Sequence, residues 1–230
     1  MNTQNQNLVE LLFGNDELDF TKANVKDFIV KPSNLRVTRD FIEKWHYSRN
    51  VNGLTISQVF GLFHEKNLIG AMIYGSLAMP NQWKKYAKEE NRVVELKRLC
   101  CIDKTPKNTE SYFIGKTLRW MKQHSGFDLV VSYSDTFYGH EGIIYKASNF
   151  KHCGMTTKGK VIDYNGKFYH DKCIRTYYVD KTGVKKVKPF AQRIKSALET
   201  GDAKYVQMPK KHIYIYPLKN IQSNINMLSR

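Results

Sequence analysis

The chain has 230 residues, of which 41% are hydrophobic and 13% aromatic, so it is no disordered segment and can bury the core of one domain with an extension. Its 37 Lys and Arg residues outnumber 21 acidic ones and give a net charge of +16, which indicates a polyanionic partner, nucleic acid before membrane. No apolar run approaches the roughly 20 residues of a membrane helix and the N-terminus has no signal pattern, so we expect an intracellular protein without a membrane partner.

The first part of the chain predicts a short arm, a strand and a helix. Residues 1–26 are polar and form the expected arm, and residues 27–31 form the expected first strand, which Pro32 ends. A helix follows through Trp45, with Ser33 or Thr38 as its cap. Just past this helix the sequence places four polar side chains that are candidates for a site: His46, Tyr47, Ser48 and Arg49.

A hairpin and a central strand follow. Residues 59–64 and 68–74 read as two strands around a short turn, and residues 93–102 as a third. Between them lies a charged excursion whose aromatic residues alternate with lysines, a pattern that suits nucleic-acid contact: Trp83, Lys84, Lys85 and Tyr86. After residue 102 a polar loop leads into an amphipathic helix, which Thr109 can cap and which contains Ser111.

The stretch from residue 128 to 154 carries the densest set of polar groups. A buried strand, residues 129–131, is followed by Asp135, then by a loop with two glycines and His140, then by a helix over residues 143–150 that contains Tyr145. Open α/β sheets present ligand sites at the carboxyl ends of their strands, as this order would. We interpret the stretch as the centre of a site, although a plain strand-to-helix crossover with a turn aspartate is the alternative.

The remaining sequence predicts a hairpin and a basic extension. Residues 155–179 read as two strands around Asn165-Gly166, a strong turn signal. The whole order indicates an α/β domain with a mixed sheet over residues 27–180. Residues 181–230 are the basic extension, which we expect to pack on the domain and contact DNA phosphates through Lys185, Lys186, Lys188 and Arg193. The apolar residues 213–218 suit an extra strand or a subunit contact, so a homodimer stays open.

Two resemblances emerge from these motifs. The order of elements, with Tyr145 on a helix that ends in Asn149-Phe150, resembles the GNAT acyltransferase fold over residues 27–180. The segments 46–48, 95–99, 132–135 and 139–150 together resemble the Mom family of phage DNA-modification proteins, which have a GNAT-like fold. This resemblance implies a transferase in the cytoplasm of a bacterial host that installs a carbamoylmethyl-like group on N6 of adenine in double-stranded DNA and so protects the DNA from restriction.

The implied reaction assigns roles to the candidate residues. Adenine N6 is a weak nucleophile inside the duplex, so the base must be flipped out and must lose a proton as the new bond forms. Asp135 is the expected base, with His46 as its alternative or partner, and Tyr145 the expected proton donor. The expected recognition residues are Tyr47, Ser48 and Ser111. Trp83 or Tyr86 would stack near the flipped base, and Arg49 and the lysine cluster would bind phosphates.

The donor and a metal are separate expectations. GNAT enzymes hold the pyrophosphate of acetyl-CoA on a glycine-rich loop, but the corresponding residues 105–111 contain no glycine and end in Glu110-Ser111. The donor is therefore expected to be an acyl or aminoacyl compound other than acetyl-CoA. His46, Asp135 and His140 could form a two-His, one-carboxylate set of the kind that binds iron(II). The four cysteines have no zinc-site spacing and are expected to be buried thiols.

Two other function classes remain open at this point. One is a GNAT N-acyltransferase that acts on RNA, a protein or a small molecule, which would share the fold and the charge. The other is a non-catalytic DNA-binding protein, which would explain the charge but not the polar residues around Asp135 and His46.

Overall fold

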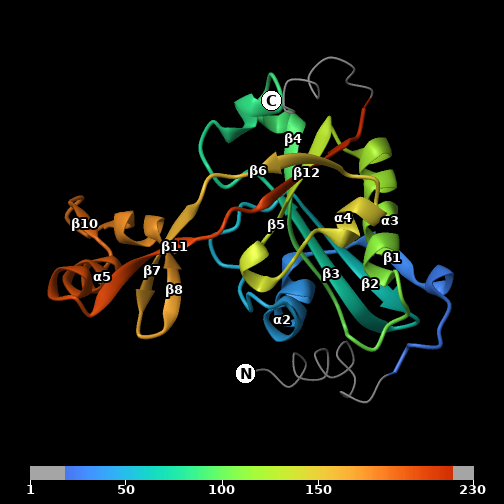
Figure 1. Cartoon of the computed structure of the whole chain (residues 1–230), viewed down its shortest axis with the longest axis horizontal. Helices are drawn as coiled ribbons and strands as arrows, with labels where there is room; N and C mark the ends of the chain where they lie inside the picture. The colour runs from blue at the N-terminus through green and yellow to red at the C-terminus, as the bar shows by residue number, and fades with distance from the viewer. Residues whose placement is uncertain (1–18, 220–230) are drawn as a thin grey trace. The chain divides into compact units, whose positions relative to one another are not determined.

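The computed structural model describes residues 19–219, which form two compact units (Figure 1). The first unit takes in the described residues up to Ser134, together with Gly142–Gly154 and the chain from Ile213 on. The second unit comprises Asp135–Glu141 and Met155–His212. The structure thus divides the chain differently from the expected boundary at residue 180, because the predicted hairpin after residue 155 belongs with the basic segment and the chain end returns to the first unit. Most of the expected arm lies outside the described residues.

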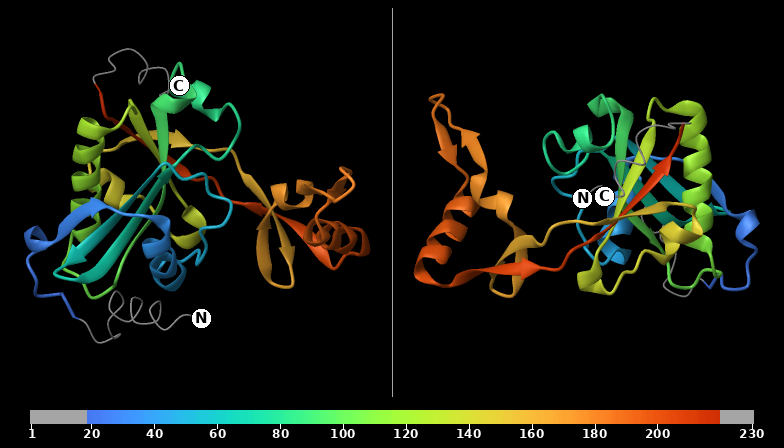
Figure 2. Two further views of the ribbon diagram at one scale, coloured as in Figure 1. Left: turned by 180° about the vertical axis from the view of Figure 1, so that it is seen from behind. Right: turned by 45° about the horizontal axis from the view of Figure 1, so that its top comes forward.

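The first unit is a mixed sheet of seven strands in the order β1-β2-β3-β4-β5-β12-β6 (Figures 1 and 2). The strands are β1 (Ile29–Pro32), β2 (Gln58–His64), β3 (Asn67–Gly75), β4 (Val93–Cys101), β5 (Leu129–Ser134), β6 (Lys151–Met155) and β12 (His212–Pro217). The helices are η1 (Val25–Asp27), α2 (Leu35–Trp45), η2 (Gln82–Lys85), η3 (Glu90–Arg92), α3 (Thr109–His124) and α4 (Ile143–Ala147). β12 contains the apolar residues 213–218 up to Pro217 and answers the open question about them: they add a strand to this sheet.

Helices cover both faces of this sheet because the strands are apolar on both sides. On one face Phe60, Leu62 and Met72 pack with the buried residues Phe113 and Leu118 of α3. On the other face Val59, Ala71 and Ile73 pack with Phe41 and Ile42 of α2. The expected mixed α/β architecture is confirmed. The chain of this unit runs in the order hairpin, central strand, α3, β5, the Tyr145-bearing α4 and a final pair of strands.

Helix caps and one helix length differ from the predictions. The side chain of Asn34, not Ser33 or Thr38, caps α2 by accepting a hydrogen bond from the Val37 backbone N–H at 3.1 Å. Asn108, which has a left-handed backbone, precedes α3, and Thr109 is the first helical residue. α4 ends at Ala147 rather than Phe150, and it buries Tyr145 while Ile143 is exposed.

The second unit is a three-stranded sheet with a separate hairpin and one long helix. Its sheet order is β11-β7-β8, and β9 pairs with β10. The elements are η4 (Thr136–Tyr138), β7 (Gly159–Tyr164), β8 (Lys167–His170), η5 (Asp171–Arg175), β9 (Tyr177–Val179), β10 (Lys185–Val187), α5 (Pro189–Thr200) and β11 (Ala203–Met208). Asn165 and Gly166 both have positive φ in the β7–β8 turn, which confirms the predicted hairpin.

No helix among residues 19–219 is long and apolar enough to cross a membrane. The four cysteines are free. Cys100 is buried as predicted, and burial raises the pKa of its thiol to about 12. Cys153 and Cys173 are partly exposed, contrary to the prediction of buried thiols, because β6 and η5 are sparsely covered.

Substitution of Gly75, at the end of β3, tests the packing of the first unit. A Cβ at Gly75 would come within 1.7 Å of the Thr55 carbonyl oxygen, whereas a Cβ at Gly115, inside α3, would meet nothing within 4 Å. We expect Gly75→Ala to destabilise the first unit by at least about 1–3 kcal/mol and Gly115→Ala to stabilise it by about 0.5–1 kcal/mol. Urea unfolding followed by tryptophan fluorescence measures both, since Trp45, Trp83 and Trp120 all lie in this unit. Equal effects of the two changes would contradict the packing described here.

Candidate functional site

The candidate site lies where β4 and β5 stop pairing with each other. The two strands pair in parallel from Val93–Leu129 to Leu96–Ser132, and both continue beyond the last pair. In β4 the bulge against β3 falls at Lys97, because Leu96 pairs with Tyr74 and Arg98 with Ile73. Bulges re-aim side chains and are common next to active sites. The side chains at this point are therefore turned away from the regular alternation of the sheet.

A buried ion pair occupies this position. The Lys97 Nζ lies 2.8 Å from a carboxylate oxygen of Glu95, and the two side chains are only 5% and 13% exposed. Water does not screen a pair with so little exposure, so each charge depends on the other and on nearby polar groups. Glu95 and Lys97 were not among the predicted site residues. The signal in the sequence was two opposite charges inside an otherwise apolar strand.

Tyrosines surround the Glu95 carboxylate. Tyr145 of α4 hydrogen-bonds with Ser132 of β5, and its ring packs on Phe150 and Tyr214 at centroid distances of 5.5 and 5.2 Å. Burial, with smaller contributions from Tyr47 and Glu95, raises the pKa of Tyr145 to about 12. Its hydroxyl therefore keeps its proton at neutral pH and can donate it, the role predicted from the sequence.

Tyr133 and Tyr86 are a second group of tyrosines whose pKa the charge of Glu95 raises. The Tyr133 hydroxyl accepts a hydrogen bond from the Gln82 Nε2 at 2.7 Å and lies 3.2 Å from the Tyr86 hydroxyl. Burial first, then the neighbouring hydroxyl and Glu95, raise the pKa of Tyr133 far above its usual value. Tyr86 is only 5% exposed and belongs to the core with Val93 and Leu129. The prediction that Tyr86 stacks on DNA is therefore wrong, and Trp83 packs partly against the same core.

The turn after α2 brings His46 and Ser48 together. The Ser48 backbone N–H donates to His46 Nδ1 at 3.1 Å, so this nitrogen is an acceptor without a proton. The Ser48 hydroxyl lies 2.8 Å from the same nitrogen and 3.4 Å from the Asn50 carbonyl. The shorter contact makes Ser48 and His46 a hydroxyl–base pair of the kind that enzymes use to move protons. His46 is buried, and its ring stacks on that of Tyr47.

Arginines lie beside this turn. Arg98 of β4 donates to the Asn50 carbonyl at 3.1 Å, and burial lowers the pKa of its guanidinium while Tyr47 and Glu95 raise it. Through these contacts Arg98 connects the His46 turn with the ion pair of β4. Arg49 is exposed and has a left-handed backbone, with φ of 43°, which is compatible with its predicted contact with a phosphate.

Asp135, the predicted base, lies in the second unit and is held there by two partners. Its carboxylate pairs with the Lys211 ammonium at 2.5 Å and caps η4 by accepting a hydrogen bond from the Phe137 N–H at 3.2 Å. The side chain is about 10% exposed. The ion pair with Lys211 and the capping bond to η4 both engage this carboxylate, so these contacts favour a structural role for Asp135.

Ser111 belongs to the first turn of α3, and its hydroxyl donates to the Asn108 carbonyl at 3.0 Å. No contact described in the structure connects it with the tyrosine and histidine groups of β4, β5 and the α2 turn. Among residues 19–219, no three His, Cys, Asp or Glu side chains are gathered so that they could hold a metal. The predicted iron(II) set is divided between the units, since His46 lies in the first and Asp135 and His140 in the second, and we derive no step through a metal.

The predicted DNA-binding lysines are exposed. Lys84 and Lys85 lie in η2, and Lys185 and Lys186 in β10. The Lys185 ammonium lies over the Tyr177 ring, 4.8 Å from its centroid, and that of Lys186 pairs with Asp180 at 2.7 Å. Lys188 and Arg193 are exposed at the start and in the middle of α5.

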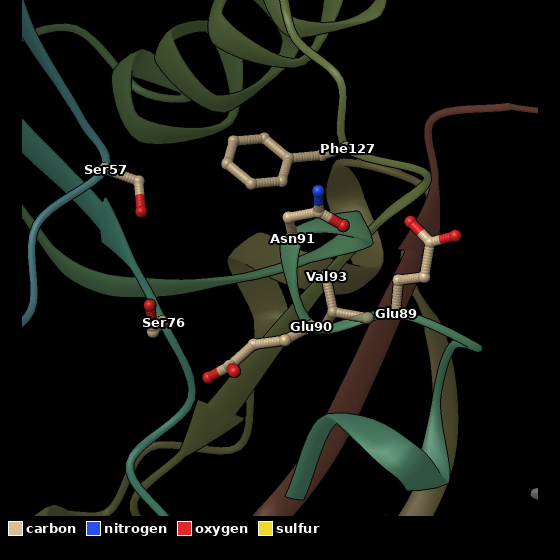
Figure 3. A pocket seen from close by; sticks show the side chains of 7 residues that line it. All are labelled: Ser57, Ser76, Glu89, Glu90, Asn91, Val93 and Phe127. Carbon is tan, nitrogen blue, oxygen red and sulfur yellow. The ribbon is translucent and has the colours of Figure 1, made fainter. Parts of the chain in front are cut away.

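A pocket of about 680 Å³ in the first unit lies apart from these groups (Figure 3). It is lined by Ser57, Ser76, Glu89, Glu90, Asn91, Val93 and Phe127. Val93 begins β4 and Phe127 precedes β5, so the pocket is at the ends of these strands where they enter the sheet, and two carboxylates line it. No predicted site residue lines this pocket, and its acidic lining disfavours a phosphate-bearing substrate.

Comparisons with known proteins give the chain a family. The methylcarbamoylase Mom of Escherichia phage Mu is 29% identical over 150 residues, which are 64% of this chain and 61% of the phage Mu protein. Similar solved structures include NAA60 of Arabidopsis thaliana in complex with acetyl-CoA (13% identity, TM-score 0.45, 83% of this chain and 98% of that chain). Another is the spermidine N-acetyltransferase of Vibrio cholerae (9% identity, TM-score 0.47, 84% and 95%).

The family profile that matches is that of the Mom protein family, and it spans residues 27–229. This range holds both units, the Glu95–Lys97 pair and the His46–Ser48 turn. Together with the identity to the phage Mu protein, it establishes that this chain belongs to the Mom protein family.

Proposed function

We propose that this chain is a phage-type transferase that installs a carbamoylmethyl-like group on N6 of adenine in duplex DNA and thereby protects the DNA from restriction. The observation that carries the proposal is the match to the Mom family over residues 27–229. The related phage Mu protein is named a methylcarbamoylase, which supports this type of group. The net charge of +16 supports a polyanionic acceptor.

The contacts of the site support a sequence of proton movements. The N6 amine must lose a proton as its bond to the electrophilic carbon forms. We propose that Ser48 takes this proton while it passes its own to His46 Nδ1, the acceptor 2.8 Å away. Tyr145, whose hydroxyl stays protonated at neutral pH, would donate to the leaving group or hold the donor carbonyl. Asp135, with its lysine partner, would then position η4 instead of acting as the base.

The donor is proposed to be an acyl or aminoacyl compound. The backbone N–H groups at the start of α3 are available to an anion because Asn108 makes no side-chain capping bond, but the negative charge of Glu110 in the first turn would repel one. This arrangement argues against a pyrophosphate there, and hence against acetyl-CoA. The mass of the group found on DNA will decide between donors.

Nucleoside mass spectrometry of plasmid DNA after co-expression with this protein tests the function. We expect a heavier deoxyadenosine, whose mass increase equals one carbamoylmethyl group less the hydrogen it replaces. An acetyl increment would instead identify acetyl transfer. Unmodified DNA, with expression confirmed, would contradict the proposal and favour a GNAT N-acyltransferase with an RNA, protein or small-molecule acceptor.

Substitutions at Ser48 and Asp135 distinguish the two possible bases. We expect Ser48→Ala to lower the modification rate by about 100-fold or more, because the route to His46 is lost, while DNA affinity is kept. Asp135→Asn should lower the rate much less, because asparagine also caps helices. Ser57→Ala, in the pocket of Figure 3, is the matched control and should leave the rate unchanged.

These variants also separate the function classes. Full activity in Ser48→Ala together with loss of activity in a folded Asp135→Asn would make Asp135 the base, as first predicted. A non-catalytic DNA-binding protein would modify no DNA in any of the three variants or in the unchanged chain.

Charge neutralisation in β10 and α5 tests the contact with DNA. Replacing Lys185, Lys186 and Lys188 by glutamine should weaken duplex binding and reduce the slope of log affinity against log salt by up to about 2–3, because phosphate contacts release counterions. The control replaces three exposed lysines of the first unit, Lys22, Lys26 and Lys66, which changes the net charge equally. Equal losses in the two triple variants would show that only net charge matters, and unchanged binding would remove the cluster from the interface.

A further inference from the structure

The second unit exposes several aromatic rings that its own core does not use, and three of them form a cluster. Phe137, Tyr138 and Phe168 are 44%, 48% and 46% exposed. The core of this unit consists of other residues, with Ile162, Ile194, Ala197 and Ala203 at its centre. Large exposed aromatic side chains are uncommon without a partner, and clustered ones mark interaction sites.

The three rings form one cluster although they come from distant parts of the sequence. Phe137 and Tyr138 lie in η4, and Phe168 lies in β8. The Phe137 ring meets the Tyr138 ring edge to face at 5.1 Å and the Phe168 ring edge to face at 5.8 Å. Edge-to-face contacts keep the rings at steep angles to one another, so that ring faces remain available to a further planar group.

The cluster is held in place by contacts around η4. The Asp135 carboxylate caps η4 and pairs with Lys211, and the Thr136 hydroxyl donates to the Lys210 carbonyl at 2.8 Å. Gly139, with φ of 72°, ends η4. The rings are therefore fixed before any partner binds, which lowers the entropic cost of binding. This gives Asp135 a positioning role that does not require it to be a base.

The charge around the cluster decides the kind of partner. In this unit fourteen Lys and Arg residues stand against seven acidic residues. Lys167, exposed, directly precedes Phe168, and Lys210, also exposed, lies next to η4 through its backbone. Aromatic rings combined with lysines bind unpaired nucleotides, whose bases stack on the rings while their phosphates meet the ammonium groups.

We propose that Phe137, Tyr138 and Phe168 form a stacking platform for unpaired bases of the DNA substrate, with Lys167 and Lys210 on the adjoining phosphates. This inference rests on the proposed function, because a base that is flipped for modification leaves unpaired neighbours in the duplex. The sequence predicted that Trp83 or Tyr86 would stack on a base. We assign the stacking role to this platform instead, because Trp83 and Tyr86 pack into or against the core.

The experiment compares two double variants of the full chain. Phe137→Leu with Phe168→Leu keeps apolar side chains but removes the ring faces. The matched control, Phe190→Leu with Tyr205→Leu, changes two other exposed rings of this unit, at 38% and 44%. Affinity is measured by fluorescence anisotropy for a single strand and for a perfect duplex over a range of salt, and stacking by the quenching of 2-aminopurine placed in the single strand.

We expect the platform variant to lose about 5- to 100-fold in affinity for the single strand, with an unchanged salt slope and lost 2-aminopurine quenching. The loss for the perfect duplex should be smaller, and the control should lose less for the single strand. Unchanged single-strand affinity, or equal loss in the control, would overturn the proposal. So would a change from dimer to monomer in sedimentation, because the cluster would then be a subunit contact. These binding results do not depend on whether nucleoside analysis finds a modified base.

Discussion

The ion pair between Glu95 and Lys97 is the constraint around which the first unit is arranged. Two charges inside a sheet are tolerated only when each compensates the other and nearby polar groups complete their hydrogen bonding. Glu95 and Lys97 are two residues apart in β4, and the register of β4 against β3 shifts at Lys97. Burial around the pair raises the pKa of Tyr133, Tyr145 and, at the edge of the core, Tyr86. The same buried environment thus supplies hydroxyl groups that stay protonated at neutral pH.

The two units differ in chemistry. The first concentrates ionisable groups in its sheet, and the turn after α2 places Ser48 Oγ 2.8 Å from His46 Nδ1. The second has a small core, many lysines and exposed rings, which are properties of a surface that holds a polyanion. A transferase that acts on a base within a long polymer needs both: a site that excludes water and a surface that retains the polymer.

Asp135 shows how one local pattern is compatible with two roles. An acidic residue at the end of a buried strand is a common feature of α/β active sites, and this pattern alone favours a catalytic role. The structure adds Lys211, which lies 76 positions further along the chain, and the capping bond to the Phe137 N–H. Neither partner can be recognised from the local pattern, because the ion pair forms only when the chain returns from β11.

The sequence by itself determined the type and order of the main helices and strands up to α4, the mixed α/β class, the hairpin at Asn165-Gly166, the basic charge and the segments that carry the family resemblance. These depend on local periodicity, turn chemistry and composition, which are readable over short windows. Only the tertiary structure decided that residues 213–217 insert between β5 and β6, that Tyr86 is buried and that Phe137 meets Phe168. Strand insertion, burial and the ring contact depend on residues far apart in sequence, so no local pattern contains them.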